Sequence, residues 1–101
     1  MTTERINALL AQAYGAQQSG DRDAAVRIYN EVLALAPEHP GALNSLGIMA
    51  INAGDARTSA AYHARAATAD PTAGPLWLNL ARAQREMGDR KSTRLNSSHV
   101  D

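Results

Sequence analysis

The sequence predicts an all-α protein built from antiparallel helical hairpins, and three observations support this. Apolar residues make up 45% of the 101 residues and aromatic residues only 4%, and the apolar share is mostly alanine and leucine, which favour helix over strand. A Gly-Asp pair recurs every 34 residues, beginning at Gly20, Gly54 and Gly88. Prolines repeat at the same spacing, at Pro37 and Pro71. This regular spacing of residues that end helices indicates repeated units that stack into one small domain.

The first hairpin is expected over about residues 7–40, with helices near 4–18 and 22–36. Gly20 can supply the left-handed residue that ends the first helix, and Asp21 can cap the second helix by accepting a hydrogen bond from its first turn. Pro37 stops the second helix, because proline lacks an amide donor and disfavours helix in the residue before it. Gly-Asp is therefore expected to form the corner of the hairpin.

The second hairpin repeats this plan over about residues 41–73, with helices near 41–53 and 56–69. Gly54 and Asp55 form its corner, and Pro71 ends its second helix. Pro40 is well placed in the first turn of the hairpin, where a missing amide donor has no effect on the helix.

The third hairpin is expected to be incomplete, over residues 74–89, with one helix near 75–87 that has Pro75 in its first turn. A corner is expected at Gly88-Asp89, yet the residues after it do not form a second amphipathic helix. The domain is therefore assigned to residues 1–89, followed by a polar tail over residues 90–101.

Leu95 and Val100 are the apolar residues of this tail, which should therefore be frayed or weakly helical. Two interpretations remain open. The tail is either a polar cap that closes the array, or non-native sequence joined to a truncated gene, since Lys91 to His99 resembles vector- or adapter-derived sequence. In the second case the face of helix 75–87 that carries Trp77, Leu80 and Ala81 is uncovered, and self-association through this helix is expected.

Residues at fixed positions in each unit resemble the tetratricopeptide repeat over about residues 7–89. The matching positions are Leu9, Ala13, Gly20, Ala25, Tyr29 and Pro37, then Leu43, Leu46, Gly47, Gly54, Ala66 and Pro71, then Trp77, Leu80, Ala81 and Gly88. The sequence departs from the family pattern at Gln12, Val32, Ser59 and His63, the last in place of an aromatic residue. The resemblance implies a right-handed superhelix of about two and a half repeats.

Residue size supports this packing. Small residues at Ala13, Gly47 and Ala81 would allow the two helices of a hairpin to approach closely, and Trp77, like Leu9 and Tyr29, would fill the space between hairpins.

In this family the first helices of the hairpins line a concave groove that binds a protein or peptide partner. The resemblance places thirteen residues there: Asn7, Leu10, Tyr14, Gln17, Asn44, Ser45, Ile48, Ile51, Asn52, Leu78, Asn79, Arg82 and Arg85. The asparagines among them could hydrogen-bond a partner backbone, or could simply be solvated. Some family members clamp the terminal carboxylate of chaperone tails with cationic residues; those positions hold Leu10, Tyr14, Ser45, Pro75 and Asn79 here, which argues against that partner class.

Other functions lack support in the sequence. Ten Lys+Arg residues balance ten Asp+Glu residues and there is no cysteine, so nucleic-acid binding, disulfides and thiolate metal sites are not expected. His39, His63 and His99 are far apart, so neither a metal site nor a catalytic pair is expected. No cofactor is expected either. The sequence shows no signal peptide or membrane span, and a cytoplasmic location is expected.

The leading hypothesis is therefore a non-enzymatic interaction scaffold that holds a partner segment or a neighbouring domain. The alternative is the N-terminal repeat region of a larger enzyme, such as an aspartyl/asparaginyl β-hydroxylase-like dioxygenase or a sulfotransferase, whose catalytic domain is absent. The run from Leu76 to Ala81 is compatible with that setting. A third hypothesis is assembly through end-to-end stacking.

Overall fold

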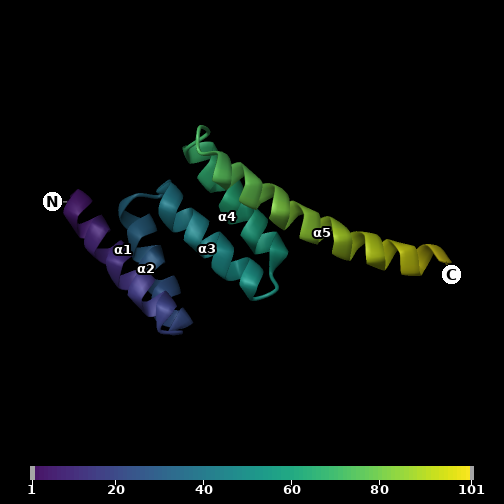
Figure 1. The fold of residues 1–101 in the computed structure, drawn as a ribbon, viewed down its shortest axis with the longest axis horizontal. Helices are drawn as coiled ribbons and strands as arrows, with labels where there is room; N and C mark the ends of the chain where they lie inside the picture. The colour runs from purple at the N-terminus through teal and green to yellow at the C-terminus, as the bar shows by residue number, and fades with distance from the viewer. Residues whose placement is uncertain (1, 101) are drawn as a thin grey trace.

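The computed structural model describes the backbone of residues 2–100 and the side chains of residues 2–88. Within residues 2–100 it contains five helices and no strand (Figure 1): α1 is Thr2–Gln18, α2 is Arg22–Leu35, α3 is Pro40–Asn52, α4 is Ala56–Ala69 and α5 is Gly74–Val100. The all-α prediction is confirmed, and the first four helices lie within two residues of their expected limits.

The corners of the first two hairpins have the predicted chemistry. Gly20 and Gly54 both adopt a φ of +85°, a left-handed conformation that is strained for other residues. Asp21 accepts a hydrogen bond from the backbone N–H of Ala24 at 3.2 Å, and Asp55 accepts one from Thr58 at 3.1 Å. Both aspartates therefore cap the helices that follow them, as predicted.

The start of α3 uses a cap that the sequence analysis missed. Pro40 is the first residue of the helix, as expected, and the preceding His39 accepts a hydrogen bond at Nδ1 from the backbone N–H of Ala42, at 3.1 Å. His39 therefore caps α3 as the two aspartates cap α2 and α4. Its Nδ1 can accept this hydrogen bond only while it carries no proton.

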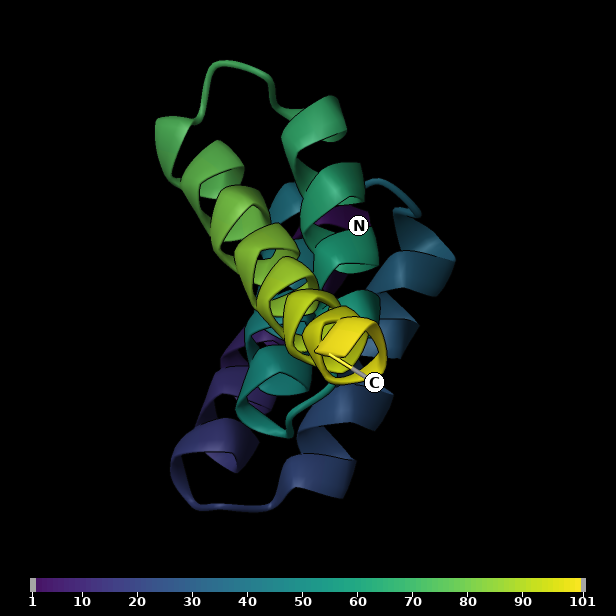
Figure 2. The ribbon, with the colours of Figure 1, turned by 90° about the vertical axis from the view of Figure 1, so that its right-hand side faces the viewer.

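The helices form an elongated array with extents of 59 × 30 × 19 Å. Each helix packs against the next in the chain, and α2 against α3 makes the least extensive of these contacts. Figure 1 shows α1, α2, α3 and α4 side by side, with α5 lying along α4 and then projecting beyond the array. The view in Figure 2 looks toward the end of α5 and shows that the other helices stack behind it.

The predicted corner at Gly88-Asp89 is wrong. The backbone is helical through both residues, and α5 continues to Val100, although the sequence predicts a helix end near residue 87. No second apolar segment follows that would gain from folding back onto α5, so nothing compensates for breaking its backbone hydrogen bonds. No proline follows Pro75 to stop the helix.

The core consists of two adjoining clusters. The first joins the first hairpin to α3 and contains Leu9, Ala13, Ala25, Ile28, Tyr29, Val32, Ala42, Leu46 and Met49. The second joins α3 and α4 to α5 and contains Leu43, Ala66, Ala67 and Leu76. Leu33 and Tyr62 are partly buried against both clusters, so the hairpins share one continuous apolar interior.

A small residue permits a close contact between the two helices of the second hairpin. A Cβ at Gly47 would lie only 2.6 Å from Cε1 of His63, so α4 approaches α3 at a point that only glycine allows. The hydroxyl of Ser59 donates a hydrogen bond to the carbonyl of Gly47 at 2.7 Å in the same place. Ser59 therefore adds a polar contact where the family pattern has alanine.

Trp77 does not fill a space between hairpins. Its side chain is 46% exposed, and the neighbouring Ala81 is also exposed, while Leu80 is half-buried. The indole Nε1 donates to the carbonyl of Pro71 at 2.9 Å. Among the described side chains none covers Trp77 on this face of α5.

Candidate functional site

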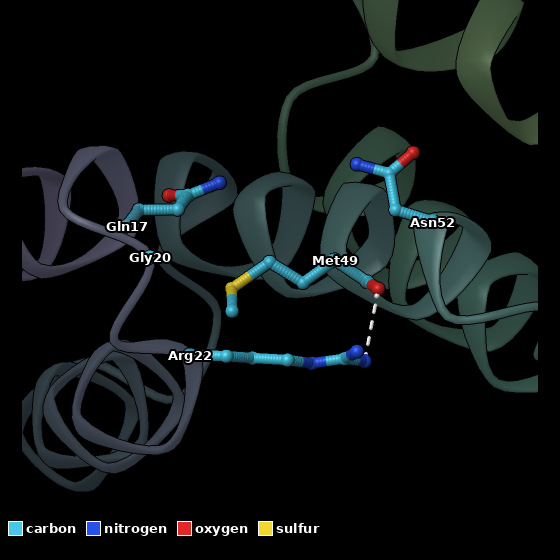
Figure 3. Close-up of a pocket in the computed structure, with 5 residues that line it drawn as sticks. All are labelled: Gln17, Gly20, Arg22, Met49 and Asn52. Carbon is cyan, nitrogen blue, oxygen red and sulfur yellow. Dashed lines mark hydrogen bonds between the residues drawn. The ribbon is translucent and has the colours of Figure 1, made fainter.

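Three adjoining depressions run across the helices α1, α3 and α5. The first lies between the corner of the first hairpin and α3, and has a volume of about 250 Å³. It is lined by Gln17, Gly20, Arg22, Met49 and Asn52 (Figure 3). The guanidinium of Arg22 donates to the carbonyl of Met49 at 3.2 Å, which ties the start of α2 to α3 and fixes one wall of the depression.

The central depression lies where α3, α4 and α5 meet, and has a volume of about 230 Å³. Its lining combines apolar, amide and charged groups: Ile48, Ile51, Asn52, His63, Asn79, Arg82 and Glu86. Helix α4 contributes a single residue, His63, to this wall. The side chains of α3 and α5 therefore make up most of the surface that a ligand would meet.

The third depression lies along α5, with a volume of about 340 Å³, and is lined by Leu78, Asn79, Ala81, Arg82 and Arg85. Neighbouring depressions share residues. Asn52 lines both the first and the central one, and Asn79 and Arg82 line both the central and the third. The three depressions therefore adjoin one another through shared residues, and together we call them the groove.

A hydrogen bond between asparagines crosses from α3 to α5. Nδ2 of Asn79 donates to Oδ1 of Asn44 at 2.9 Å. Because each amide group has two donors and one acceptor oxygen, the N–H groups of Asn44 and the oxygen of Asn79 keep capacity for a ligand. The bond also connects the two helices that form the centre of the groove.

A polar network supports the other end of the groove. The hydroxyl of Tyr29 donates to Oε1 of Gln17 at 2.7 Å, and burial raises the pKa of Tyr29, an effect that a hydrogen bond from Ser45 partly opposes. The ring of Tyr14 meets that of Tyr29 edge to face, with centroids 6.0 Å apart. Residues from α1, α2 and α3 therefore hold Gln17 in place.

The structure places eight of the thirteen expected groove residues in these depressions: Gln17, Ile48, Ile51, Asn52, Leu78, Asn79, Arg82 and Arg85. Asn44 adjoins the groove through its bond to Asn79. Asn7 and Tyr14 are exposed on α1 outside the three depressions, and Leu10 packs against the first core cluster. Ser45 is only 8% exposed and serves the tyrosine network from inside the fold.

Sequence reasoning missed several lining residues, of which Arg22, His63 and Glu86 bear charge or can acquire it. The sequence could have identified Glu86, because this residue follows Asn79 and Arg82 at the spacing that keeps residues on one face of a helix. His63 and Arg22 come from second helices, which the groove pattern of the family does not include.

The described part of the chain offers no candidate for two other kinds of site. Among its side chains, no group of three or more histidines, cysteines or carboxylates is placed to hold a metal ion. None of the helices described combines the length and the apolar character that crossing a bilayer requires.

Comparison with known proteins links the repeat pattern to a family and to one relative. The model of the tetratricopeptide repeat family matches residues 8–40, which form the first hairpin. A segment of 55 residues is 44% identical to part of the cellulose synthase 2 operon protein C of Komagataeibacter xylinus. This match covers 54% of the chain and 4% of the length of that relative.

Proposed function

We propose that this chain, a tetratricopeptide-repeat protein, acts as an interaction scaffold that holds a segment of a partner protein in its groove. Repeats of this family generally mediate protein–protein interaction. The observation that carries the proposal is that neighbouring depressions share Asn52, Asn79 and Arg82 along three helices of the array. An arrangement of this kind suits an extended or helical segment better than a small molecule, which would need one enclosed cavity.

The lining of the central depression supports a peptide ligand. Ile48 and Ile51 offer apolar surface for a side chain, and Asn52 and Asn79 carry amide groups that can bond a peptide backbone. Arg82 and Glu86 place charges of both signs at the edge. Apolar contact at the centre with polar groups around it is the usual arrangement in protein interfaces.

A charge reversal in the groove tests the proposal. Arg82→Glu changes a residue shared by two depressions, and we expect it to weaken binding of a captured partner by roughly tenfold or more, as a central interface arginine does. The matched control is Arg57→Glu, the same substitution at an exposed residue of α4 that lines none of the three depressions. The partner is first captured with the full chain, and calorimetry then measures its affinity for each variant.

Two results would argue against the groove as the binding site. One is capture of no macromolecule from extracts of the source cells by the immobilised chain. The other is an equal loss of affinity in both arginine variants, which would indicate a nonspecific response to net charge.

A second candidate places the occupant of the groove in the same polypeptide. The relative from Komagataeibacter xylinus is far longer than the matched segment, so a related repeat segment forms a small part of a large protein there. The chain would then be the repeat region ahead of a further domain, either more repeats or a catalytic domain of the dioxygenase or sulfotransferase kind. Reading the genomic frame beyond codon 91 distinguishes these cases, and a stop codon at once would exclude them.

A further inference from the structure

His63 is a buried titratable side chain at the contact between α3 and α4. It is only 2% exposed, and its ring lies against Gly47 so closely that a Cβ there would come within 2.6–2.9 Å of three ring atoms. Within the described part of the chain its Nδ1 has no hydrogen-bond partner. The same side chain forms the α4 contribution to the central depression. His63 therefore belongs both to the contact between α3 and α4 and to the wall of the groove.

The surroundings of His63 provide little compensation for a positive charge. Helix α3, Pro40–Asn52, contains no charged or titratable side chain. On α4 itself the titratable groups are Arg57, Tyr62 and Arg65, and Arg65 is directed to the carbonyl of Pro37. Helix α5 brings one cation, Arg82, and one carboxylate, Glu86, to the depression. An imidazolium at position 63 would therefore be buried beside an uncharged helix.

We propose that His63 makes the contact between α3 and α4 a proton-sensitive joint, closed while the imidazole is neutral and opened when it is protonated. An imidazolium needs water or a counter-ion, and the central depression next to it is the nearest route for water. Hydration of the buried Nδ1, which lies against Gly47, requires α4 to move away from this glycine, where the hydrogen bond from Ser59 also holds the two helices together. Acid therefore loosens the middle of the array and one wall of the groove together.

The direction of the effect follows from the burial of the ring. Burial lowers the pKa of His63 below its ordinary value of 6.5. The unfolded chain consequently takes up a proton on this residue more readily than the folded chain does, so acid favours the unfolded or opened state. The stabilisation is complete above pH 6.5 and is lost as the pH falls from there toward the lowered pKa.

The test compares two chains that both carry His39→Asn. This background change removes the other described histidine, whose cap also fails on protonation, and asparagine is a good cap in its place. One chain keeps His63 and the other carries His63→Phe, which restores the aromatic residue of the family pattern. Urea unfolding is measured from about pH 7 to about pH 5, where histidine titrates.

With His63 present, the unfolding equilibrium constant should rise with acid by up to about tenfold per pH unit between pH 6.5 and the lowered pKa. In the His63→Phe chain this component should be absent, and the titrations that both chains share cancel in the difference. Equal pH dependence in the two chains would overturn the proposal.

Direct titration covers the case in which phenylalanine does not fit beside Gly47. In the chain with His39→Asn alone, NMR should show the His63 ring protons titrating below pH 6.5. Backbone amides of α3 and α4 should exchange faster with solvent as that titration proceeds. A His63 pKa at or above its ordinary value, or protonation without faster exchange at the α3–α4 contact, would rule out the joint.

Discussion

Gly47 shows how a single missing side chain sets the geometry of a hairpin. Its carbonyl accepts from Ser59, and the ring of His63 occupies the space that a Cβ would take. We expect Gly47→Ala to destabilise the protein by roughly 1 to 3 kcal/mol, because the ring must shift within a packed contact. Urea unfolding monitored by circular dichroism measures the change in free energy of unfolding.

Gly15→Ala provides the matched control at the residue scale. Gly15 lies inside α1, and a Cβ there would meet nothing within 4 Å. Alanine should stabilise this position by about 0.5 to 1 kcal/mol, because it lowers the entropy lost on forming helix. Destabilisation of similar size at both glycines would show that the contact with His63 does not decide the result.

His63 illustrates what residue-level reasoning could and could not predict. Its position in the repeat identifies it as a substitute for a packed aromatic residue, and the structure confirms that it is buried. The absence of charge between residues 40 and 52 can be read from the sequence, but the missing partner of Nδ1 and the contact with Gly47 depend on how α3 and α4 pack. Spacing along one helix does not contain that information.

At the scale of elements, Tyr29 connects the first hairpin to the second. Tyr29→Phe removes the hydroxyl that bonds Gln17 and leaves the buried Ser45 without this partner. We expect a loss of roughly 1 to 3 kcal/mol in the free energy of unfolding, as for a buried polar group left unsatisfied. Denaturant unfolding of the purified variants provides the measurement.

Tyr14→Phe separates the hydrogen bonds from the ring contact. Tyr14 is 47% exposed, and its ring contact with Tyr29 does not need the hydroxyl. The change should therefore stay within about 0.5 kcal/mol, as is usual for surface substitutions. If both phenylalanine variants lost the same stability, the network would not be what joins α1, α2 and α3.

The sequence predicted the ends of the helices well where individual residues determine them. Left-handed Gly20 and Gly54, and the proline at the start of α3, act on the backbone directly, and each is found as expected. The prediction failed at Gly88-Asp89, where the same pair of residues lies inside α5. A Gly-Asp pair permits a corner, but packing of the next helix is needed to stabilise one.

The groove was predicted less completely than the helices. Family positions predict groove residues on first helices, and Ile48, Ile51 and Asn52 of this set line the central depression. They cannot identify Arg22, whose reach to the carbonyl of Met49 depends on how α2 and α3 lie together. Ser45, also expected in the groove, is buried and hydrogen-bonds the hydroxyl of Tyr29.

At the scale of the whole molecule, the uncovered face of α5 favours self-association. Trp77 is 46% exposed, and Ala81, one turn further along the same face of α5, is also exposed. Sedimentation over a range of concentrations should show reversible association, and Trp77→Gln should weaken it by roughly tenfold or more, because a tryptophan anchor dominates an interface of this kind.

Leu35→Gln is the control for this prediction. Leu35 is 41% exposed at the end of α2, a helix without an extensive contact to α5, so its replacement lowers surface hydrophobicity and leaves Trp77 in place. Association should persist in this variant. A strict monomer for the unmodified chain at high concentration would exclude self-association through α5.

The sharing of Asn52 between two depressions affects how any binding measurement on this protein should be understood. A ligand seated in one depression changes the surroundings of an amide group that also faces the next, so the two are not independent sites with separate affinities. Occupants of both would be coupled, and fragments that each bind weakly should gain affinity when joined by a linker of suitable length. In an alanine scan, replacement of Asn52 would then reduce binding more than its own contacts explain, because the residue lines both depressions.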